Sequence, residues 1–454
     1  MKVYTTNRDR HVRSSNQYIH IGKRIRKLRE QKNMTRKQLA KGILSDSYLR
    51  NIENGLATGS SQILSCIADK LEVPSFYLTE NTKNIFLDDQ LDQIKKLLMD
   101  GNLQQAEQYL MSIEKKYLCI PNMEQELHYF ILKAIMLSRN MKEHQAVDLF
   151  TTEIVPICTK EYVLTLDQDM YYLYNLLNIK FLIKQGFLKS AILLTQQMIE
   201  SEYEKIQKAE LSFYLAQCYR KSQQYANALD EAKKSLRLFQ QLASYKQQYH
   251  CFNLIGALYL ESGKFDSSKN YLLTARDMAV TDKNALFLSY NAVNMALVLS
   301  IHKGLDTSVQ MLKEAINTRE ALETNDCSNI YILMIDLLIK EGKEHDTIDY
   351  YFHKLKSSPC DEKAYFFTQL LQAKFDFIKG HDKEFEQQVE FLLADHSIKK
   401  YYPDIRFFLY EFGQFLKQKK RYKDACFYLE QSFKLLSNHK YSFGQPEAPF
   451  SPMG

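Results

Sequence analysis

Glycine and proline are scarce in this sequence. Its 454 residues include 14 Gly and 8 Pro, well below the roughly 7% and 5% that these residues average in proteins. A protein built from many short strands needs more turn-forming residues than this. The composition therefore favours an all-α fold of long helices.

Long apolar runs are also missing. No stretch approaches the roughly 18 apolar residues that cross a membrane, and no apolar segment of a secretory signal follows the basic N-terminus. The eight cysteines contain no C-x-x-C pair and fall mostly inside helical patterns, which predicts reduced thiols in a buried core. We therefore expect a cytoplasmic protein without a membrane partner.

Sequence signatures of catalysis are absent as well. The chain has no Gly-rich phosphate loop, no H-E-x-x-H and no G-x-S-x-G. Its eleven histidines are scattered rather than spaced as pairs of metal ligands. We expect no enzymatic activity, no cofactor and no metal site.

A helical pattern recurs along the chain, and residues 249–279 display it most clearly. Apolar or small residues at i, i+3, i+4 and i+7 form one buried face of a first helix; they are Phe252, Ile255, Gly256 and Tyr259. Gly263 ends that helix, and a second helix follows. The inner face of the second helix carries Ser268, Leu272 and Ala275. The spacing of this helical hairpin resembles that of a tetratricopeptide repeat.

The position of Ser268 recurs throughout the chain. Intervals run from 37 residues (Ala191 to Ala228) to 45 residues (Ala146 to Ala191). The recurring residues are Ala106, Ala146, Ala191, Ala228, Ser268, Ser308, Thr347, Phe385 and Ala425. A turn glycine lies five residues upstream in several hairpins, as Gly101, Gly186, Gly263 and Gly342. We predict about nine helical hairpins, each of which packs only on its neighbours.

Positive charge is concentrated near the N-terminus. Residues 1–80 hold fifteen Lys or Arg and seven Asp or Glu, a net charge of +8. Because the whole chain is +6, the other 374 residues are −2. A polyanion contact is therefore expected in the N-terminal segment alone.

The N-terminal segment departs from the repeat pattern. Residues 1–18 are basic without a periodic apolar face, so we expect a flexible arm. Residues 19–79 indicate five short helices. Thr35 and Gln38 fit a capping box at the start of the second helix. The third helix begins near Ser45 and ends at Gly55, which suits a left-handed residue after a helix C-terminus.

A motif in this segment resembles a known DNA-binding fold. The sequence TRKQLA at 35–40, followed by SDSYLRNIENG at 45–55, resembles the repressor-type helix-turn-helix of phage repressors and many bacterial regulators. Ile67, Ala68, Leu71 and Pro74 continue the resemblance, which covers about 60 residues. It implies that the second helix braces against the DNA backbone while the third lies in the major groove.

The resemblance also implies which residues contact DNA. Asp46, Ser47 and Asn51 would face base edges, with the alternative that Asp46 caps its helix. Tyr48 and Arg50 would reach bases or phosphates, while the start of the second helix contacts phosphates and fixes the register. The predicted set is Arg36, Lys37, Gln38, Ser45, Asp46, Ser47, Tyr48, Arg50 and Asn51.

A helix-turn-helix joined to repeats of about 40 residues resembles the peptide-responsive regulators of Gram-positive bacteria, the Rap/Rgg/NprR/PlcR/PrgX family. NprR-like members are nearest in architecture. The resemblance implies a linker at 80–85 and a right-handed superhelix of repeats at 86–440. It further implies a homodimer that binds double-stranded operator DNA and is switched by a short signalling oligopeptide in the concave channel of the superhelix.

Residues that could hold such a peptide lie on the first helix of each hairpin. Asn offers both a donor and an acceptor to a peptide backbone, so Asn253 is the predicted clamp, supported by Asn291 and Asn294. Arg220 or Lys221 would receive a peptide carboxylate. The predicted set is Lys180, Phe213, Gln217, Arg220, Lys221, His250, Asn253, Tyr290, Asn291, Asn294 and Asp336.

Residues 441–454 leave the helical pattern. Three prolines in this segment exclude helix and favour an extended chain, so we expect a disordered Pro-rich tail. An extended apolar segment also suits a groove. Occupation of the peptide channel by this tail is therefore an alternative.

Two other functions remain open. Rap and NprR-like proteins can bind a response regulator of the sporulation phosphorelay and promote its dephosphorylation through a glutamine near the start of their repeats. Gln90, Gln93, Gln104 and Gln105 lie in that region, and nothing in the sequence distinguishes among them. The third function is that of a peptide-independent repressor whose repeats bind a protein partner.

Overall fold

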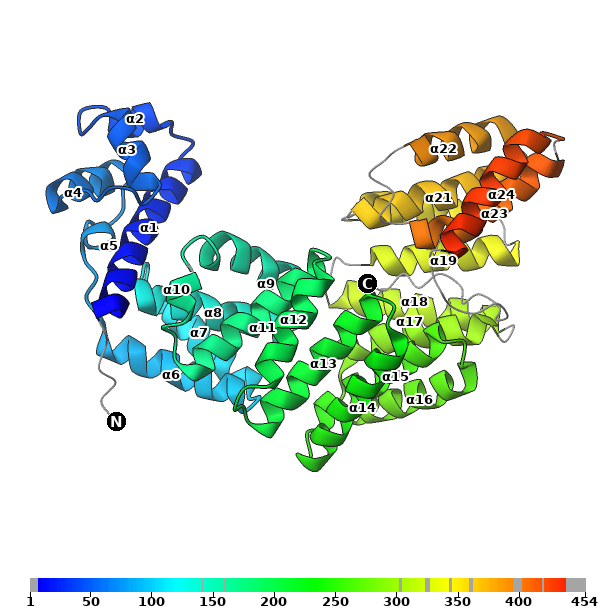
Figure 1. The fold of residues 1–454 in the computed structure, drawn as a ribbon, viewed down its shortest axis with the longest axis horizontal. Helices are drawn as coiled ribbons and strands as arrows, with labels where there is room; N and C mark the ends of the chain where they lie inside the picture. The colour runs from blue at the N-terminus through cyan, green and yellow to red at the C-terminus, as the bar shows by residue number, and fades with distance from the viewer. Residues whose placement is uncertain are drawn as a thin grey trace. The chain divides into compact units, whose positions relative to one another are not determined.

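A computed structural model describes residues 7–140, 142–158, 160–301, 304–322, 327–342, 345–358, 362–394, 402–418 and 420–437. Across these residues the chain forms helices and turns, without a β-strand. Two compact units are present, Met1–Glu200 and Ser201–Gly454, and Figure 1 shows the helices of both. Within the described ranges, no helix is long and apolar enough to cross a membrane.

The N-terminal head consists of five helices, as predicted. They are α1 (Asn7–Gln31), α2 (Arg36–Ala40), α3 (Asp46–Glu53), α4 (Ser61–Lys70) and α5 (Phe76–Thr79). Side chains from all five helices meet in one buried apolar core, which includes Ile25, Leu39, Leu49, Ile52, Ile67 and Leu78. Residues 80–84 then connect α5 to the repeats.

Helix α1 is longer than the sequence pattern indicates. The expectation of an irregular arm over residues 1–18 is wrong from Asn7 onward, where α1 already begins. Extending an anchored helix adds one hydrogen bond for each residue fixed, so an existing helix grows more easily than a new one starts. Residues 1–6 lie outside the described ranges.

Two glycines allow α1 to lie against the end of α3. A Cβ on Gly22 would be 2.1 Å from the carbonyl oxygen of Ile52. A Cβ on Gly55 would be 2.7 Å from Cγ1 of Ile19. Gly55 has a φ of 71°, which confirms the predicted left-handed residue after α3. Neither position has room for a larger residue without movement of α1.

Three hairpins follow in the first unit. They are formed by α6 (Ile85–Met99) with α7 (Leu103–Lys116), α8 (Met123–Arg139) with α9 (Glu143–Leu149), and α11 (Gln168–Lys184) with α12 (Leu188–Ile199). The π-helix η1 (Phe150–Ile154) and α10 (Lys160–Val163) separate the second hairpin from the third. Asn or Asp side chains cap the N-termini of α6, α7, α8 and α11, which explains where these helices begin.

Six further hairpins form the second unit. Their helices are α13 (Lys205–Lys221), α14 (Tyr225–Gln241), α15 (Tyr245–Glu261), α16 (Phe265–Thr281), α17 (Ala285–Ile301), α18 (Leu305–Ala321), α19 (Ser328–Glu341), α20 (His345–Ser357), α21 (Glu362–Ile378), α22 (Asp382–Ala394), α23 (Tyr402–Gln418) and α24 (Tyr422–Ser437). Together with the first unit, the described chain therefore contains the nine hairpins that the sequence predicts.

Small residues bring the two helices of a hairpin together. In α15/α16, Ser268 Oγ donates a hydrogen bond to the carbonyl oxygen of Gly256 at 2.7 Å. A Cβ on Gly256 would lie 2.7 Å from Cγ of Leu272. The last hairpin repeats this arrangement, because a Cβ on Gly413 would lie 2.6 Å from Cγ of Leu429. Close helix contact at the small position is therefore confirmed.

The turn between the two helices of a hairpin uses a left-handed residue. All four predicted turn glycines have positive φ angles, between 63° and 78°. The same place in three other hairpins holds Gln223 (φ 59°), Gly380 (φ 80°) and Lys420 (φ 61°). Backbone geometry is thus conserved among repeats even where glycine is not.

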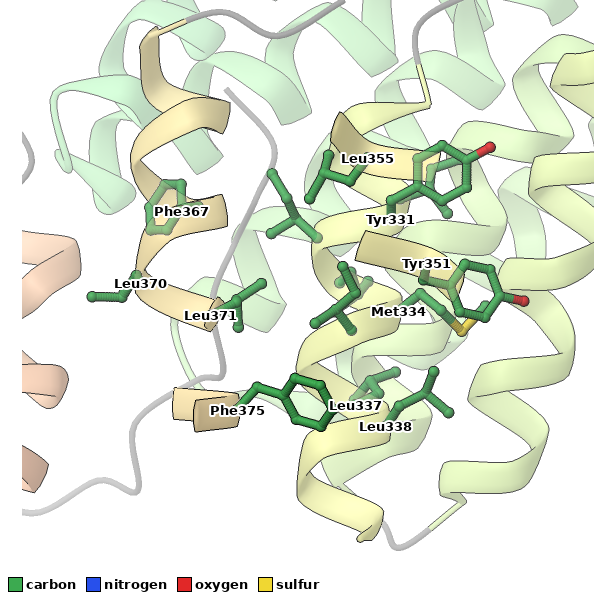
Figure 2. Packing of buried hydrophobic residues seen from close by; sticks show 14 of the residues in the cluster. Tyr331, Met334, Leu337, Leu338, Tyr351, Leu355, Phe367, Leu370, Leu371 and Phe375 are labelled. Atoms are coloured by element: carbon green, nitrogen blue, oxygen red, sulfur yellow. The ribbon is translucent and has the colours of Figure 1, made fainter. Parts of the chain in front are cut away.

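The packing position of α20 differs from the prediction by one residue. Ile348 is buried and Thr347 only half-buried, because the apolar stripe of α20 runs through Ile348, Tyr351, Phe352 and Leu355. Figure 2 shows part of the resulting cluster, with Tyr351 and Leu355 of α20 beside labelled residues of α19 and α21. The expectation that Thr347 marks this hairpin is wrong.

The cysteines are less uniformly buried than expected. Cys218, Cys251 and Cys327 occupy buried positions, whereas Cys66 and Cys426 are exposed. The prediction of core thiols is wrong for those two residues, which lie on outer faces of helices. The proposed tail, residues 441–454, lies outside the described ranges.

Candidate functional site

Helix α3 presents one polar face to solvent. Ser47, Arg50 and Asn51 are exposed on it, and Asp46 is half-buried at its first turn. The opposite face packs into the head and consists of Leu49, Ile52 and Glu53. A helix with an exposed polar face and a buried apolar face can enter a groove without unfolding the domain that carries it.

Ser45 and Tyr48 have structural partners. Ser45 Oγ accepts a hydrogen bond from the backbone nitrogen of Tyr48 at 3.2 Å and is the N-cap of α3. The Tyr48 hydroxyl donates to the carbonyl oxygen of Thr58 at 2.9 Å and so ties α3 to the loop before α4. Of the two roles considered for Asp46, capping is therefore performed by Ser45.

The first turn of α2 carries Arg36, Lys37 and Gln38. Gln38 Oε1 accepts a hydrogen bond from the Thr35 backbone nitrogen at 2.7 Å. The Gln38 backbone nitrogen donates to Thr35 Oγ1 at 3.2 Å, which completes the predicted capping box. Lys37 is exposed and Arg36 is half-buried. The side-chain carbonyl oxygen of Gln38 is thus engaged within the protein.

A buried carboxylate, Glu126 of α8, joins the head to the repeats. Arg24 of α1 donates to Glu126 Oε2 from Nε at 3.0 Å and from Nη2 at 2.8 Å. The Tyr77 hydroxyl, in α5, donates to Oε1 at 2.9 Å. His20 Nε2 also bonds Oε2. The sequence did not predict this cluster. Arg24 lies among other basic residues of its helix, as a solvated residue would, and Glu126 has no feature that distinguishes it from an exposed helix residue.

Arg24 is fully engaged at this junction. Its guanidinium also donates to the carbonyl oxygens of Tyr77 at 2.6 Å, Ile120 at 2.5 Å and Pro121 at 3.0 Å. Its Cζ lies 4.1 Å from the centroid of the Tyr77 ring. A buried cation is tolerated when each of its donors has an acceptor.

The charge states of the cluster follow from its burial. Burial, and then the proximity of Arg24, lowers the pKa of His20. Burial alone would raise the pKa of Glu126, but Arg24 and His20 together lower it to about 2. At neutral pH the pair is therefore a neutral imidazole donating to a carboxylate, and Arg24 supplies the positive charge.

Three predicted asparagines of the second unit contact one another. Asn291 Nδ2 of α17 donates to Asn253 Oδ1 of α15 at 3.1 Å and to the Leu272 carbonyl oxygen at 3.0 Å. Asn294 Nδ2 donates to Asn253 Oδ1 at 3.4 Å. Asn253 Nδ2 and Asn294 Oδ1 take no part in these bonds. Within the described residues, Asn291 Oδ1 is buried without a partner.

Other predicted peptide-binding residues are engaged elsewhere. Arg220 of α13 forms a two-pronged ion pair with Glu261 of α15, with distances of 2.6 to 3.1 Å. Tyr290 lies under Arg319, whose Cζ is 4.2 Å from the ring centroid. A peptide carboxylate would therefore have to displace Glu261 from Arg220.

The rest of the predicted set is spread over both units. Lys180 of α11 donates to Ser138 Oγ at 2.5 Å and to Glu143 Oε1 at 2.7 Å. Asp336 of α19 is buried and accepts from Lys340 at 2.6 Å. Phe213, Gln217 and His250 are half-buried, and Lys221 is exposed. The bonds described above join only the three asparagines to one another; the other bonded members have partners outside the set.

A polar pocket of about 570 Å³ lies among α20, α21 and α22. In it, Gln372 and Gln388 donate to opposite oxygens of Asp376 at 3.2 and 3.1 Å. Its lining also includes Phe352, His353 and Lys356. The repeat pattern gave no signal for this pocket, because five of its eight lining residues belong to second helices, where a polar residue has the pattern of a solvated side chain.

Comparison with known proteins supports the assignment of the head. Residues 25–78 match the family model described as Helix-turn-helix, which spans α2 and α3. The chain is 22% identical over 422 residues to the transcriptional activator NprA of Geobacillus stearothermophilus, covering 88% of this chain and 99% of NprA.

Two solved structures are similar in fold. A Rap protein complexed with competence and sporulation factor has a TM-score of 0.58 at 16% identity, covering 78% of this chain and 98% of that one. NprR in complex with its cognate peptide NprX has a TM-score of 0.57 at 13% identity, covering 78% and 99%. The predicted resemblance to the helix-turn-helix and repeat regulators is confirmed. At these identities the structures establish the fold of the repeats and leave their ligands to be tested.

Proposed function

We propose that the protein is a transcription regulator that binds operator DNA through its head and is switched by a short oligopeptide bound along the first helices of its repeats. The observation that carries the proposal is the exposed polar face of α3, with Ser47, Arg50 and Asn51, on a head that matches the helix-turn-helix family. Ser and Asn are side chains that read base edges, and Arg reads guanine or binds phosphate.

The charge distribution supports DNA binding by the head and ligand binding by the repeats. The N-terminal 80 residues carry the excess of positive charge and the rest of the chain is nearly neutral. DNA affinity derives largely from neutralised phosphates. The head is therefore the part suited to DNA, and the repeats are left free for another ligand.

The asparagine cluster supports a peptide ligand. An extended peptide must pair its backbone N–H and C=O groups, and the bonds within the cluster use neither Asn253 Nδ2 nor Asn294 Oδ1. Asn253 is half-buried, so its Nδ2 is the donor that a peptide could reach, while the buried Asn294 and Asn291 hold the Asn253 side chain in place. NprR and a Rap protein, both similar in fold, are known in complex with a peptide and with competence and sporulation factor.

The test is a gel shift of the full chain on its own promoter region, with synthetic peptides from small neighbouring reading frames. We expect one peptide to strengthen or abolish a specific shift. Asn253→Ala should weaken the response to that peptide and leave DNA binding intact. Asn270→Ala is the matched control, because Asn270 is exposed on α16 in the same hairpin.

Two other results of the gel shift would favour the alternative functions. Specific DNA binding that no peptide changes would overturn the switch and favour a peptide-independent repressor. A protein without specific DNA binding would favour the response-regulator function, which incubation with phosphorylated response regulators tests directly.

A further inference from the structure

The connection between the head and the repeats is short and hydrogen-bonded. Residues 80–84 lie between α5 and α6. Asn81 Oδ1 accepts from the backbone nitrogen of Met123 at 3.0 Å, and the Asn84 backbone nitrogen donates to Gln125 Oε1 at 3.1 Å. Lys83 pairs with Glu124 at 2.8 Å. The connection therefore runs along the first turn of α8, immediately before Glu126.

The head contacts the repeats at separate points. Arg24 and His20 of α1 reach Glu126, and Tyr77 of α5 reaches the same carboxylate from another helix. One turn further along α1, Lys27 Nζ pairs with Glu153 of η1 at 2.6 Å. Contacts from two helices of the head to α8 and η1 restrain rotation as well as distance.

Of the contacts between the head and the repeats, the buried ones at Glu126 contribute most to docking. Without the Glu126 carboxylate, Arg24 would remain buried at the interface without its counter-charge, and separation of the two surfaces would then be favoured. The pair between Lys27 and Glu153 is partly exposed and contributes less. Glu126 is therefore the residue on which docking depends most.

Docking leaves the candidate DNA-binding face open. Ser47, Arg50 and Asn51 remain exposed while α1 and α5 face the repeats. We propose that Glu126 sets the orientation of the head on the first repeats and so is a positioning residue for DNA binding at paired half-sites. The inference rests on the proposed DNA-binding function and on the homodimer expected from the sequence, which would supply two heads for two half-sites. A docked head presents α3 at one fixed angle, whereas an undocked head on a short tether accepts many.

The experiment compares the full chain with Glu126→Gln. Glu114→Gln is the matched control, because Glu114 also accepts from a tyrosine and a cation, Tyr129 and Lys133, both at 2.7 Å, but entirely within the repeats. The first measurement is tryptic cleavage after Lys83, followed as release of fragment 1–83. The second is affinity for duplexes with one half-site or with two half-sites at a series of spacings.

We expect Glu126→Gln to be cleaved after Lys83 at least about tenfold faster than wild type, since local opening controls such cleavage. Its affinity for a single half-site should stay within about twofold, while the preference of wild type for one spacing is lost. Glu114→Gln should match wild type in both measurements. A purely structural role would lower all DNA binding without changing the spacing profile.

Unchanged cleavage and an unchanged spacing profile in Glu126→Gln would overturn the inference. Cleavage is measured without DNA, so it decides whether Glu126 holds the head even if the proposed DNA binding fails. Should Glu126→Gln not fold, Tyr77→Phe replaces it, because this change removes one hydrogen bond to Glu126 but leaves the buried Arg24 and Glu126 paired. An intermediate increase in cleavage is then expected, and no increase would refute the role of Glu126.

Discussion

Arg29 of α1 and Glu53 of α3 form a buried, two-pronged ion pair inside the head. Arg29 Nε lies 2.7 Å from Glu53 Oε1, and Arg29 Nη2 lies 3.1 Å from Oε2. Arg29 Nη1 also donates to the Met34 carbonyl oxygen at 2.9 Å, in the turn before α2. Hydrogen bonding to Glu53 raises the pKa of Arg29. One guanidinium thus connects α1, the start of α2 and the end of the candidate recognition helix.

Replacement of Glu53 by Ala should destabilise the head strongly. The change leaves Arg29 buried without its counter-charge, which costs about 3–5 kcal/mol for a buried pair. Hydrogen exchange of amides in α1 and α3 would measure the loss. Glu30→Ala is the control, because Glu30 lies on the same helix as Arg29 and pairs with Arg26 and, at 3.4 Å, with Arg29, but its side chain is half-exposed, and such a pair contributes about 0–1 kcal/mol. Equal exchange in the two variants would contradict the prediction.

Asn51 and Lys37 should affect DNA binding in different ways. If Asn51 contacts a base edge, Asn51→Ala loses about 1–3 kcal/mol of affinity for the specific site. Lys37→Ala should weaken all sequences alike and reduce the slope of log affinity against log salt by about 0.9. Titrations of operator and unrelated duplexes at several salt concentrations separate the two effects. Equal loss on both duplexes for Asn51→Ala would reject the base contact.

Gly256→Ala should disturb the α15/α16 hairpin. The added methyl group would meet Leu272 at 2.7 Å, and overpacking of this kind costs about 1–3 kcal/mol. In a double-mutant cycle with Leu272→Ala, the double mutant should be destabilised by less than the sum of the two single mutants, because the smaller side chain makes room for the methyl group. Urea unfolding followed by circular dichroism supplies the four free energies. Strict additivity would show that the clash does not exist.

Left-handed turn residues give opposite predictions for two substitutions. Gln223 has a φ of 59°, so Gln223→Gly removes backbone strain of about 1–2 kcal/mol. Part of that gain is offset by the larger entropy of an unfolded glycine, about 0.5–1 kcal/mol. Gly186→Ala should destabilise by about 1 kcal/mol, although a Cβ there meets no atom within 4 Å. Thermal unfolding of both variants measures the sign of each change.

Acidification should weaken the head–repeat junction in two steps. The pKa of His20 is lowered from 6.5 by burial and then by Arg24, so its contribution is complete above about pH 6.5 and is lost as pH falls below it. The pKa of Glu126 is lowered from 4.5 to about 2, so its contribution declines between those values.

The first step can be isolated with His20→Gln, which keeps a donor for Glu126 but does not titrate. Between pH 7.5 and 5.5, the melting temperature should fall less for this variant than for wild type. His128 also has a lowered pKa from burial, and the comparison cancels its contribution because both proteins retain it. Parallel melting curves for the two proteins would contradict the assignment to His20.

Local signals in the sequence were sufficient to predict the five helices of the head and the hairpins of the repeats. The capping box of Thr35 and Gln38, the left-handed Gly55 and the small residue at Ser268 each fit only a few backbone geometries, and each has the predicted form. This packing position recurs in most hairpins, although Phe385 is large and Thr347 misses the buried stripe of α20 by one residue, and its spacing of about 40 residues indicates nine hairpins, because a repeat contacts only its neighbours. Such features depend on residues a few positions apart, which a linear pattern records.

The polar contacts required the tertiary structure. His20, Arg24 and Tyr77 meet Glu126 from 49 to 106 residues away, and Arg29 meets Glu53 at a separation of 24. A charged residue on an amphipathic helix has the same local pattern whether it faces water or a buried partner. The position of the surface that packs against the helix decides between the two, since it determines whether the charge is desolvated and paired. The sequence by itself thus specified the helices and hairpins, while the folded chain decided which charges hold the head in place.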